Sequence, residues 1–276
     1  MTKSNDSPSG FSMPTLTYRV WKVWRRNFDV FMKTIHVNFL PPLLEPVLYL
    51  VALGLGLGTF ITGGIEGFSY IQFIAPALIA IAIMYGSFFE CTYSSFVRMY
   101  FQKTFDAIIA TPVSVEEVIA GELVWGATRA TINSTIVLAV VAAFGLVSSP
   151  LFLLVPLLAF FGGLMFAALG MCFTALAQDI DFFNYPSFLL ITPMFLLSGT
   201  FFPLSSLPGI VQTAAVAVLP LTHVANLTRG LVLGRIDTFL NLSTEAILLL
   251  SIAWISVVTI VFFILSINLM KKKLIR

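Results

Sequence analysis

Two opposed stripes of side chains run along residues 16–35, each with the spacing of one helix face. At about 100° per residue, the two faces point in nearly opposite directions. The apolar stripe consists of Leu16, Val20, Trp24, Phe28, Phe31 and Ile35. The charged stripe consists of Arg19, Lys22, Arg26, Asp29 and Lys33. Such a helix lies flat on a membrane with its apolar side in the headgroup boundary, so we expect an interface helix over 15–34.

Six apolar runs follow, and each is long enough to cross a bilayer, which requires roughly 20 predominantly apolar residues. They occupy approximately 35–60, 70–95, 122–146, 151–177, 185–203 and 245–269. The first contains Pro41, Pro42 and Pro46, so we expect a kink or a late helix start there. The sequence has no internal repeat and no soluble domain. It therefore predicts an all-α membrane protein of six spans, with one transmembrane domain over 15–276.

The composition agrees with a membrane location. Hydrophobic residues make up 58% of the chain and charged residues 10%, and the mean hydropathy is +0.98, whereas soluble domains contain about 25% charged residues. Cys91 and Cys172 lie in apolar runs, where we interpret them as small core residues. The first residues are polar, and no apolar region with a cleavage site follows them. We expect a disordered segment over 1–14 and no cleavable signal peptide.

Lysine and arginine near the span ends predict the orientation. They are absent from 59–69 and 147–150. They gather in the N-terminal segment, after the second span and at the C-terminus, as Lys3, Arg19, Lys22, Arg25, Arg26, Lys33, Arg98, Lys103, Lys271, Lys272, Lys273 and Arg276. Six spans with both termini in the cytoplasm fit this distribution. The connection 178–184 is then cytoplasmic although it holds Asp179, Asp181 and no cation, which makes it the weakest point of the topology.

One long connection, 204–244, is mostly apolar and follows the fifth span. Its stretch 209–219 is too short to cross the membrane and is bracketed by Pro208 and Pro220. We expect 204–235 to form a pair of short re-entrant helices in the outer leaflet. The alternative is two additional short spans.

The other long connection, 98–121, is cytoplasmic on this topology. Ser114 can cap a new helix, with Glu117 at the capping-box spacing. An apolar face before it, opposite Gln102, Lys103 and Asp106, consists of Phe101, Phe105, Ile108 and Ile109. We therefore expect a short surface helix, a tight turn and the start of the third span. Such an element either docks a partner or only floats at the interface.

Three charges are expected inside the membrane: Glu45, Glu90 and Arg129 each lie about two helical turns from the cytoplasmic end of a span. Intramembrane charges are costly unless paired or hydrated. Their similar depth suggests a Glu90–Arg129 or a Glu45–Arg129 pair, either as a static clamp or with a role in transport.

Several function classes lack their motifs. The chain has no G-x-x-x-x-G-K-[ST] loop and no cluster with metal-ligand spacing, so we expect it to bind neither nucleotide nor metal. Gly54, Gly56 and Gly58 lie in an apolar run and are expected to serve helix packing. A membrane enzyme acting on lipid phosphates has only Asp179 and Asp181 in its support. An ion-coupled carrier would need ionisable groups near the membrane midplane, and we find none there.

The chain resembles the membrane subunits of type-2 ABC exporters, most closely the NodJ-like permeases, from about residue 18 onward. The resemblance is carried by RVWKVWRRNF at 19–28, by 98–122 with its ending Ile119-Ala-Gly121-Glu122, and by Leu219-Pro220-Leu221-Thr222-His223. Its most specific part is LLITPMFLLSGTFFPLSSLP at 189–208. Permeases of this family have six spans, a cytoplasmic coupling helix between spans two and three, and re-entrant helices after span five.

The resemblance also implies the partners. Two copies of the chain would form a pore in the bacterial inner membrane, and two copies of a separate ATP-binding subunit, carrying ATP and Mg, would dock below. The expected coupling residues are Phe101, Phe105, Asp106, Ile109, Pro112, Ser114, Glu116 and Glu117. The expected cargo is amphipathic or glycan-containing, with hydrophobic drugs as the alternative and with no role for nucleic acid. Aromatic residues that could line its path include Phe195, Phe201 and Phe202.

Overall fold

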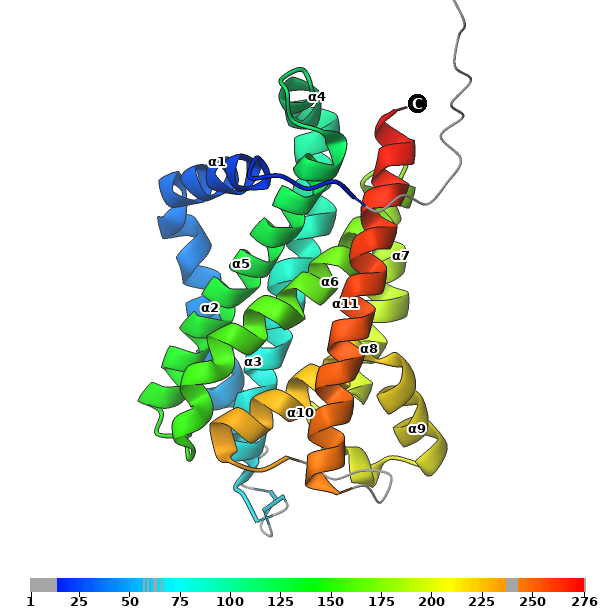
Figure 1. Ribbon diagram of the computed structural model, residues 1–276. Helices are drawn as coiled ribbons and strands as arrows, with labels where there is room; N and C mark the ends of the chain where they lie inside the picture. The colour runs from blue at the N-terminus through cyan, green and yellow to red at the C-terminus, as the bar shows by residue number, and fades with distance from the viewer. Residues whose placement is uncertain are drawn as a thin grey trace, which may run out of the picture.

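The computed structural model describes residues 14–56, 58, 60–61, 64–65, 67–236 and 243–275. The described residues form a bundle of helices with no strand, which confirms the predicted all-α membrane fold (Figure 1). Five helices are long and apolar enough to cross a membrane. The segment 1–14, predicted to be disordered, lies outside the described residues except for Pro14.

The interface helix α1, Val20–Lys33, lies across one end of the bundle in Figure 1, and α2, Ile35–Tyr49, turns away from it along the bundle. The helix α2 begins directly after Thr34 and contains all three prolines, so the late start expected from them does not occur. A π-helical segment, Leu50–Gly56, continues it. Only 11% of this candidate span is buried, so most of its surface is left to lipid or to a partner.

The second span is longer than predicted. The helix α3, Tyr70–Phe89, continues through two π-helical segments, Glu90–Ser94 and Val97–Phe101, into one unit of 32 residues. At about 1.5 Å per residue it extends beyond a hydrocarbon core of about 30 Å. Phe101 therefore ends this long helix and does not belong to the short helix that follows, contrary to the predicted apolar face.

The connection after the second span consists of α4, Thr104–Ile109, and a turn before α5, Val115–Ala143. Lys103 reverses the chain before α4 with a φ of 53°. The predicted capping box starts α5: the backbone N–H of Glu117 donates to Ser114 Oγ over 3.2 Å, and the N–H of Ser114 donates to Glu117 Oε2 over 2.8 Å. The third span thus begins at Val115, seven residues before the apolar run.

The fourth span joins a 3₁₀ turn, Pro150–Leu154, to α6, Val155–Leu176. The fifth predicted span, 185–203, is short and irregular. After a 3₁₀ turn at Asp181–Phe183 it consists of α7, Asn184–Pro186, a π-helical segment, Ser187–Ile191, and α8, Thr192–Leu197. The helix ends at Leu197, ahead of the predicted end at 203, and it is not among the five long apolar helices. Pro186 and Pro193 both remove backbone donors from this run.

The short helices expected after the fifth span are present. A 3₁₀ turn, Leu204–Ser206, precedes α9, Gly209–Val218, and α10, Pro220–Leu233, which meet at 90°. Both lie at the end of the bundle opposite α4, and α11, Thr244–Leu274, starts at that end and returns to the α4 end (Figure 1). A pair bent in this way is either a re-entrant pair or one broken span, and not two separate spans. The two ends of the described chain therefore lie at the same end of the bundle.

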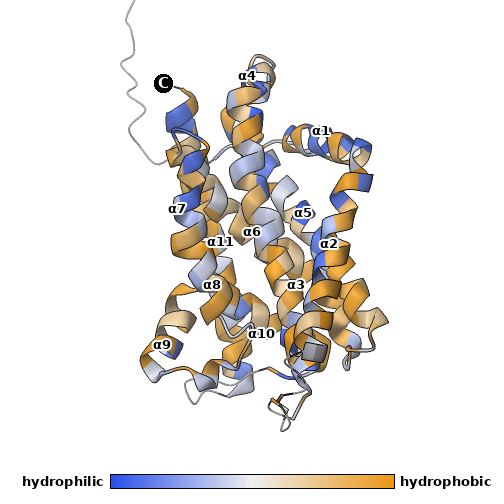
Figure 2. Ribbon diagram, turned by 180° about the vertical axis from the view of Figure 1, so that it is seen from behind, coloured by the Kyte–Doolittle hydropathy of each residue, from blue (hydrophilic) through white to orange (hydrophobic). Residues whose placement is uncertain are grey.

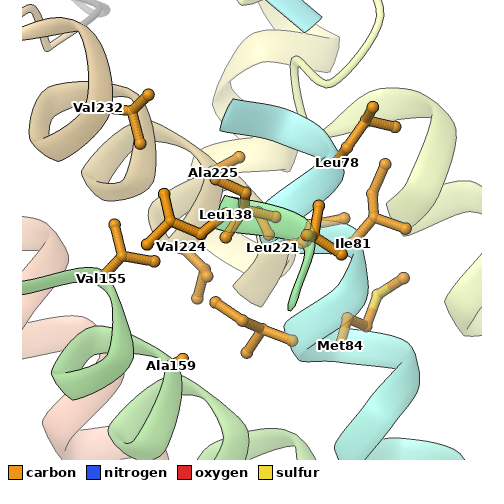
Figure 3. Close-up of a cluster of buried hydrophobic side chains, with 14 of the residues drawn as sticks. Leu78, Ile81, Met84, Leu138, Val155, Ala159, Leu221, Val224, Ala225 and Val232 are labelled. Carbon is orange, nitrogen blue, oxygen red and sulfur yellow. The ribbon is translucent and has the colours of Figure 1, made fainter. Parts of the chain in front are cut away.

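Helices α3, α5, α6 and α10 share the main apolar core. Figure 3 shows Leu221, Val224 and Ala225 of α10 among side chains of α3 and α6. Many hydrophilic residues gather at α1, α4 and the C-terminal end of α11, while apolar residues dominate the spans (Figure 2). Inside a bilayer, moving apolar side chains from lipid into a helix contact gives no hydrophobic gain, because lipid is also apolar. Close packing through small residues therefore holds such helices together.

One such close approach allows a stability prediction. A Cβ on Gly163 of α6 would lie 2.6 Å from Ala130 Cβ and 3.2 Å from Ala127 Cα of α5. We expect Gly163→Ala to destabilise the protein by about 1–3 kcal/mol, the usual cost of overpacking, and to lower its thermal midpoint in size-exclusion assays of the heated, solubilised chain. Gly209→Ala is the matched control, since a Cβ there meets no described atom within 4 Å. Equal midpoints for the two variants would contradict the packing argument.

Candidate functional site

The loop around α4 projects from one end of the bundle (Figure 1). Phe105 points inward and is completely buried against Val115, Val118 and Ile119, so it fastens α4 to α5. Ile108 and Ile109 are half-buried. The outer surface of the loop, which we call the tip, consists of Asp106, Ala107, Ala110, Thr111 and Pro112, all exposed.

The charged stripe of α1 divides into two groups. Lys22, Asp29 and Lys33 are exposed. Arg19 and Arg26 instead bind the loop: the Arg19 guanidinium donates to the Pro112 carbonyl, and Arg26 Nη2 donates to Thr104 Oγ1 over 3.3 Å. Burial lowers the pKa of the Arg26 guanidinium, an effect that Glu122 opposes and Arg98 reinforces.

The segment before α1 reaches the loop as well. The Thr17 hydroxyl donates to the Glu117 carboxylate, which also receives the backbone N–H of Ser114 in the capping box. Only 2% of Glu117 is exposed, so its carboxylate is occupied inside the protein. The interface helix therefore holds both ends of the loop.

The apolar stripe of α1 packs on protein as well as facing the membrane. Phe31 is buried, and its ring lies 5.7 Å from that of Trp125 on α5. Trp24 Nε1 donates to Thr128 Oγ1 over 2.8 Å. By contrast, Trp21 is 55% exposed, outside the predicted stripe, and stacks on Trp24 at 4.1 Å. The helix is thus fixed to α5 and still presents large apolar groups to the bilayer.

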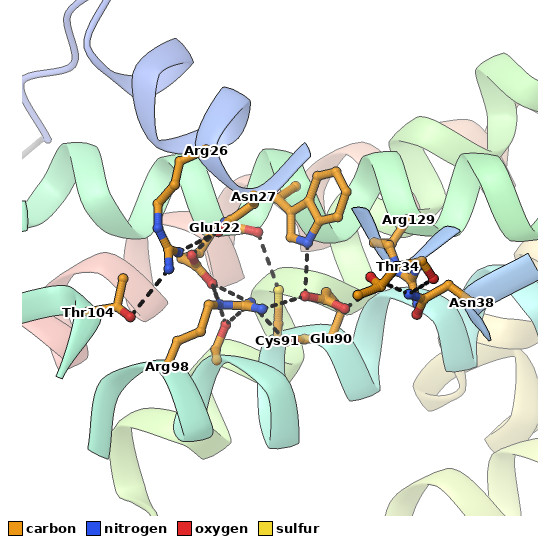
Figure 4. Close-up of polar contacts among 12 residues, drawn as sticks. Arg26, Asn27, Thr34, Asn38, Glu90, Cys91, Arg98, Thr104, Glu122 and Arg129 are labelled. Atoms are coloured by element: carbon orange, nitrogen blue, oxygen red, sulfur yellow. Dashed lines mark hydrogen bonds and ion pairs between the residues drawn. The ribbon is translucent and has the colours of Figure 1, made fainter. Parts of the chain in front are cut away.

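A buried ion network joins α1, the α3 extension and α5 (Figure 4). Its centre is Arg98, whose Nη1 lies 2.7 Å from Glu90 Oε1 and whose Nη2 lies 2.5 Å from Glu122 Oε2. Asn27 Nδ2 donates to Glu122 Oε1 over 2.7 Å, and Trp125 Nε1 donates to Glu90 Oε1 over 2.8 Å. Because Glu122 is fully buried, these contacts must stand in for water.

Of the two alternative ion pairs that the sequence suggested for Arg129, the structure contains one. The predicted Glu90–Arg129 contact is present, with 3.5 Å between Glu90 Oε2 and Arg129 Nε. No Glu45–Arg129 pair forms. Sequence reasoning missed Arg98 as the central cation, although it lies eight residues, about two turns, after Glu90. Glu122 was noted only as the end of a motif.

The C-terminal helix is fastened to the same face. Lys271 Nζ lies 2.6 Å from Glu116 Oε1 at the start of α5. Lys273 Nζ donates to the Thr174 carbonyl over 2.9 Å and to the Ala177 carbonyl at the end of α6. Glu116, expected to face the ATPase, is therefore paired inside the chain. Among the expected coupling residues, Asp106 and Pro112 remain at the tip.

Two adjoining clefts lie beside the network. The first, about 420 Å³, lies between α2, α3 and α5, and the second, about 370 Å³, lies under α1. Both are lined by Asn38, Glu90, Ser94 and Arg129. The first cleft also takes in Glu45, which has no ion-pair or hydrogen-bond partner among the described residues.

A column of aromatic rings leads away from the first cleft. Tyr85 and Phe89, both in its lining, stack with centroids 5.4 Å apart, and Phe195 of α8 stacks on Tyr85 at 6.0 Å. Phe201 packs edge-on against Phe195 at 4.9 Å. Of the three aromatic residues proposed for a substrate path, Phe195 contacts the cleft lining through Tyr85, Phe201 contacts Phe195, and Phe202 is 36% exposed. In the part of the chain that is described, no group of three metal-ligating side chains comes together.

The fold and these contacts define a multi-span membrane protein whose interface helix, connecting loop and C-terminal helix form one braced face. Residues 18–233 match the family described as ABC-2 type transporter, and the chain belongs to that family. It is a membrane subunit of an ABC transporter.

Its relatives agree with this assignment. The chain is 39% identical to nodulation protein J of Rhizobium meliloti (strain 1021), over 77% of this chain and 80% of that protein. It is 37% identical to nodulation protein J of Rhizobium leguminosarum bv. viciae, over 92% and 94% of the two chains. It is 27% identical to the inner membrane transport permease YadH of Escherichia coli (strain K12), over 67% and 72%.

Proposed function

We propose that the chain is the permease subunit of an ATP-driven exporter, in which two copies form the pore. Two copies of an ATP-binding partner would bind at the α4 end, and ATP and Mg would be held by that partner. The observation that carries the proposal is the exposed tip on a buried base: Phe105 fixes α4 to α5, and Arg19 fixes the turn to α1. Because the base of the loop is fixed to α5 and α1 while the tip is exposed, a displacement of the tip by a partner would move both helices.

The proposed mechanism follows the contacts inward from the tip. A displacement of α4 moves the start of α5 through Phe105, and it moves α1 through Arg19 and Arg26. Helices α1 and α5 share the ion network around Arg98 with the α3 extension, so these three elements move as a unit relative to the rest of the bundle. ATP binding to the partner would then bias two arrangements of this unit. In the orientation predicted from the lysines and arginines, the α4 end and both termini lie on the cytoplasmic side of a bacterial inner membrane.

The cargo we propose is an amphipathic or glycan-containing molecule, which the resemblance to the NodJ-like permeases implies. The cleft supports it by combining polar groups at Asn38 and Arg129 with aromatic faces at Tyr85 and Phe89. Export of hydrophobic drugs is the second candidate, favoured by the apolar part of the same cleft at Leu78, Ile81 and Val137.

A charge at the tip tests the docking surface. We expect Thr111→Arg to abolish stimulation of the partner's ATP hydrolysis, since a bulky cation at an exposed tip blocks docking without entering the core. The measurement is ATP hydrolysis by the co-purified complex in liposomes, together with recovery of the partner in a pull-down. Thr213→Arg is the control, because Thr213 is exposed on α9 at the opposite end. If the two variants hydrolyse ATP equally, the tip does not dock the ATPase.

A further inference from the structure

Arg129 stands where the two clefts meet, and its guanidinium lies over the Phe31 ring, with Cζ 4.7 Å from the ring centroid. Its Nη2 donates to Asn38 Oδ1 over 3.3 Å. Its Nε and Nη1 atoms are buried and have no hydrogen-bond partner among the described residues, the contact of Nε with Glu90 being an ion pair at 3.5 Å. Buried polar atoms are nearly always satisfied, so orphaned ones need an explanation. A guanidinium N–H without a partner can donate a charge-assisted hydrogen bond to a carboxylate or phosphate oxygen.

A second orphan lines the same cleft. Asn133 lies one helical turn after Arg129 on α5, and its Oδ1 atom is buried without a partner among the described residues. Ser94, on the α3 extension, lines both clefts. The unsatisfied atoms therefore fit a ligand that accepts a hydrogen bond from Arg129 and donates one to Asn133.

The local charge balance favours an anion. Three guanidinium groups, from Arg26, Arg98 and Arg129, lie around two carboxylates, from Glu90 and Glu122. Arg98 makes the short contacts to both carboxylates, Arg26 forms no ion pair among the described residues, and Arg129 is compensated only by its 3.5 Å contact with Glu90. Isolated charge at this depth is costly, and a bound anion would neutralise it.

The rest of the cleft is suited to a chain rather than to a second charge. Away from Arg129 its walls are apolar, formed by Pro41, Pro42, Pro46, Leu78, Ile81, Ala82 and Val137. Glu45 also lies there, apart from Arg129, and its carboxylate would repel a second anionic group. The cleft thus has one cationic end next to α1 and a long apolar side.

We propose that Arg129 and Asn133 form a head-group subsite for an anionic amphiphile that enters the cleft from the cytoplasmic leaflet. The phosphate or carboxylate accepts hydrogen bonds from Arg129, a neighbouring hydroxyl or N–H donates to Asn133, and the acyl chain lies along the proline-rich face of α2. This subsite rests on the proposed transport function, because it defines the cargo class that the permease takes up first.

The subsite is tested by binding to the full-length chain in maltoside micelles without any ATPase. The probe is dodecyl phosphate, compared with dodecyl glucoside, which has the chain without the charge, and with inorganic phosphate, which has the charge without the chain. We expect Arg129→Gln to weaken dodecyl phosphate binding by about tenfold or more, the scale of a lost charge-assisted hydrogen bond. Asn133→Leu should weaken it less, and Arg25→Gln, at an exposed cation of α1, should leave it unchanged.

Each contrary result overturns a defined part of the proposal. Equal affinity in Arg129→Gln, or equal binding of dodecyl glucoside, removes the anion subsite. If inorganic phosphate binds as tightly as dodecyl phosphate, the cleft is a site for free anions and the proposed amphiphile is wrong. Should Arg129→Gln fail to fold, Asn133→Leu decides by the same comparison. Since the assay contains no ATPase, Arg129-dependent binding would stand even if Thr111→Arg showed that the tip does not dock the ATPase.

Discussion

Replacing Arg98 by methionine is expected to destabilise the protein by about 3–5 kcal/mol, the range found when one partner of a buried ion pair is removed. The substitution would leave Glu122, fully buried, with only Asn27 and Ser95 as partners. Glu90 would keep Trp125 and the longer contact to Arg129. The two buried carboxylates would then lose the guanidinium that contacts both of them. The measurement is the thermal midpoint of the solubilised chain.

Two further variants separate the charge from the packing of the long side chain. Arg25→Met removes an exposed cation of α1 and should leave the midpoint unchanged. Adding Glu122→Gln to Arg98→Met should restore part of the loss, because one buried negative charge disappears. Arg98→Lys should fall between wild type and Arg98→Met, since a single ammonium cannot match a guanidinium that serves two carboxylates. An Arg98→Met midpoint as high as that of Arg25→Met would show that the network contributes nothing to stability.

Features of the fold that depend on local pattern were predictable from the sequence. An interface helix within 16–35, the capping box at Ser114 and the short helices after the fifth span depend on neighbours within a few residues, and all are present. The interface helix is shorter than the predicted 15–34, since Leu16 precedes it and Ile35 belongs to α2. The ends of spans were less predictable. Hydropathy predicts which residues lie in lipid, but the backbone hydrogen bonds of a helix can continue beyond them. The helices that contain α3 and α5 therefore extend past the apolar runs and support the loop.

The side chains of the candidate site needed the tertiary structure. Glu90 and Arg129 could be matched because both lie in apolar runs at similar depth, where an ionisable residue is conspicuous. Arg98 was less conspicuous because cations near a span end are ordinary evidence of orientation. Phe101 and Phe105 share an apolar pattern in the sequence, but the turn at Lys103 separates them, leaving one 67% exposed and the other completely buried.

That separation leads to the prediction for the coupling loop. Phe105→Ala is expected to remove about 3–5 kcal/mol of packing under α4, the usual cost for a fully buried phenylalanine. The loss is confined to the α4 end, because Phe105 belongs to the apolar cluster there and not to the main core of the bundle. We therefore expect a chain that still assembles in the membrane but has a loosened α4. Its partner should bind and hydrolyse ATP without driving transport.

Phe101→Ala provides the control, since the same change at an exposed ring should alter neither stability nor coupling by more than a small amount. The measurements are ATP hydrolysis and cargo export in the same proteoliposomes, so that the ratio of the two reports coupling. If the ratio of cargo export to ATP hydrolysis is the same in Phe105→Ala and Phe101→Ala, the Phe105 contact does not couple the two activities. A lower ratio in Phe105→Ala alone would place the transmission of movement at the Phe105 contact, because the exposed tip is chemically unchanged in both variants.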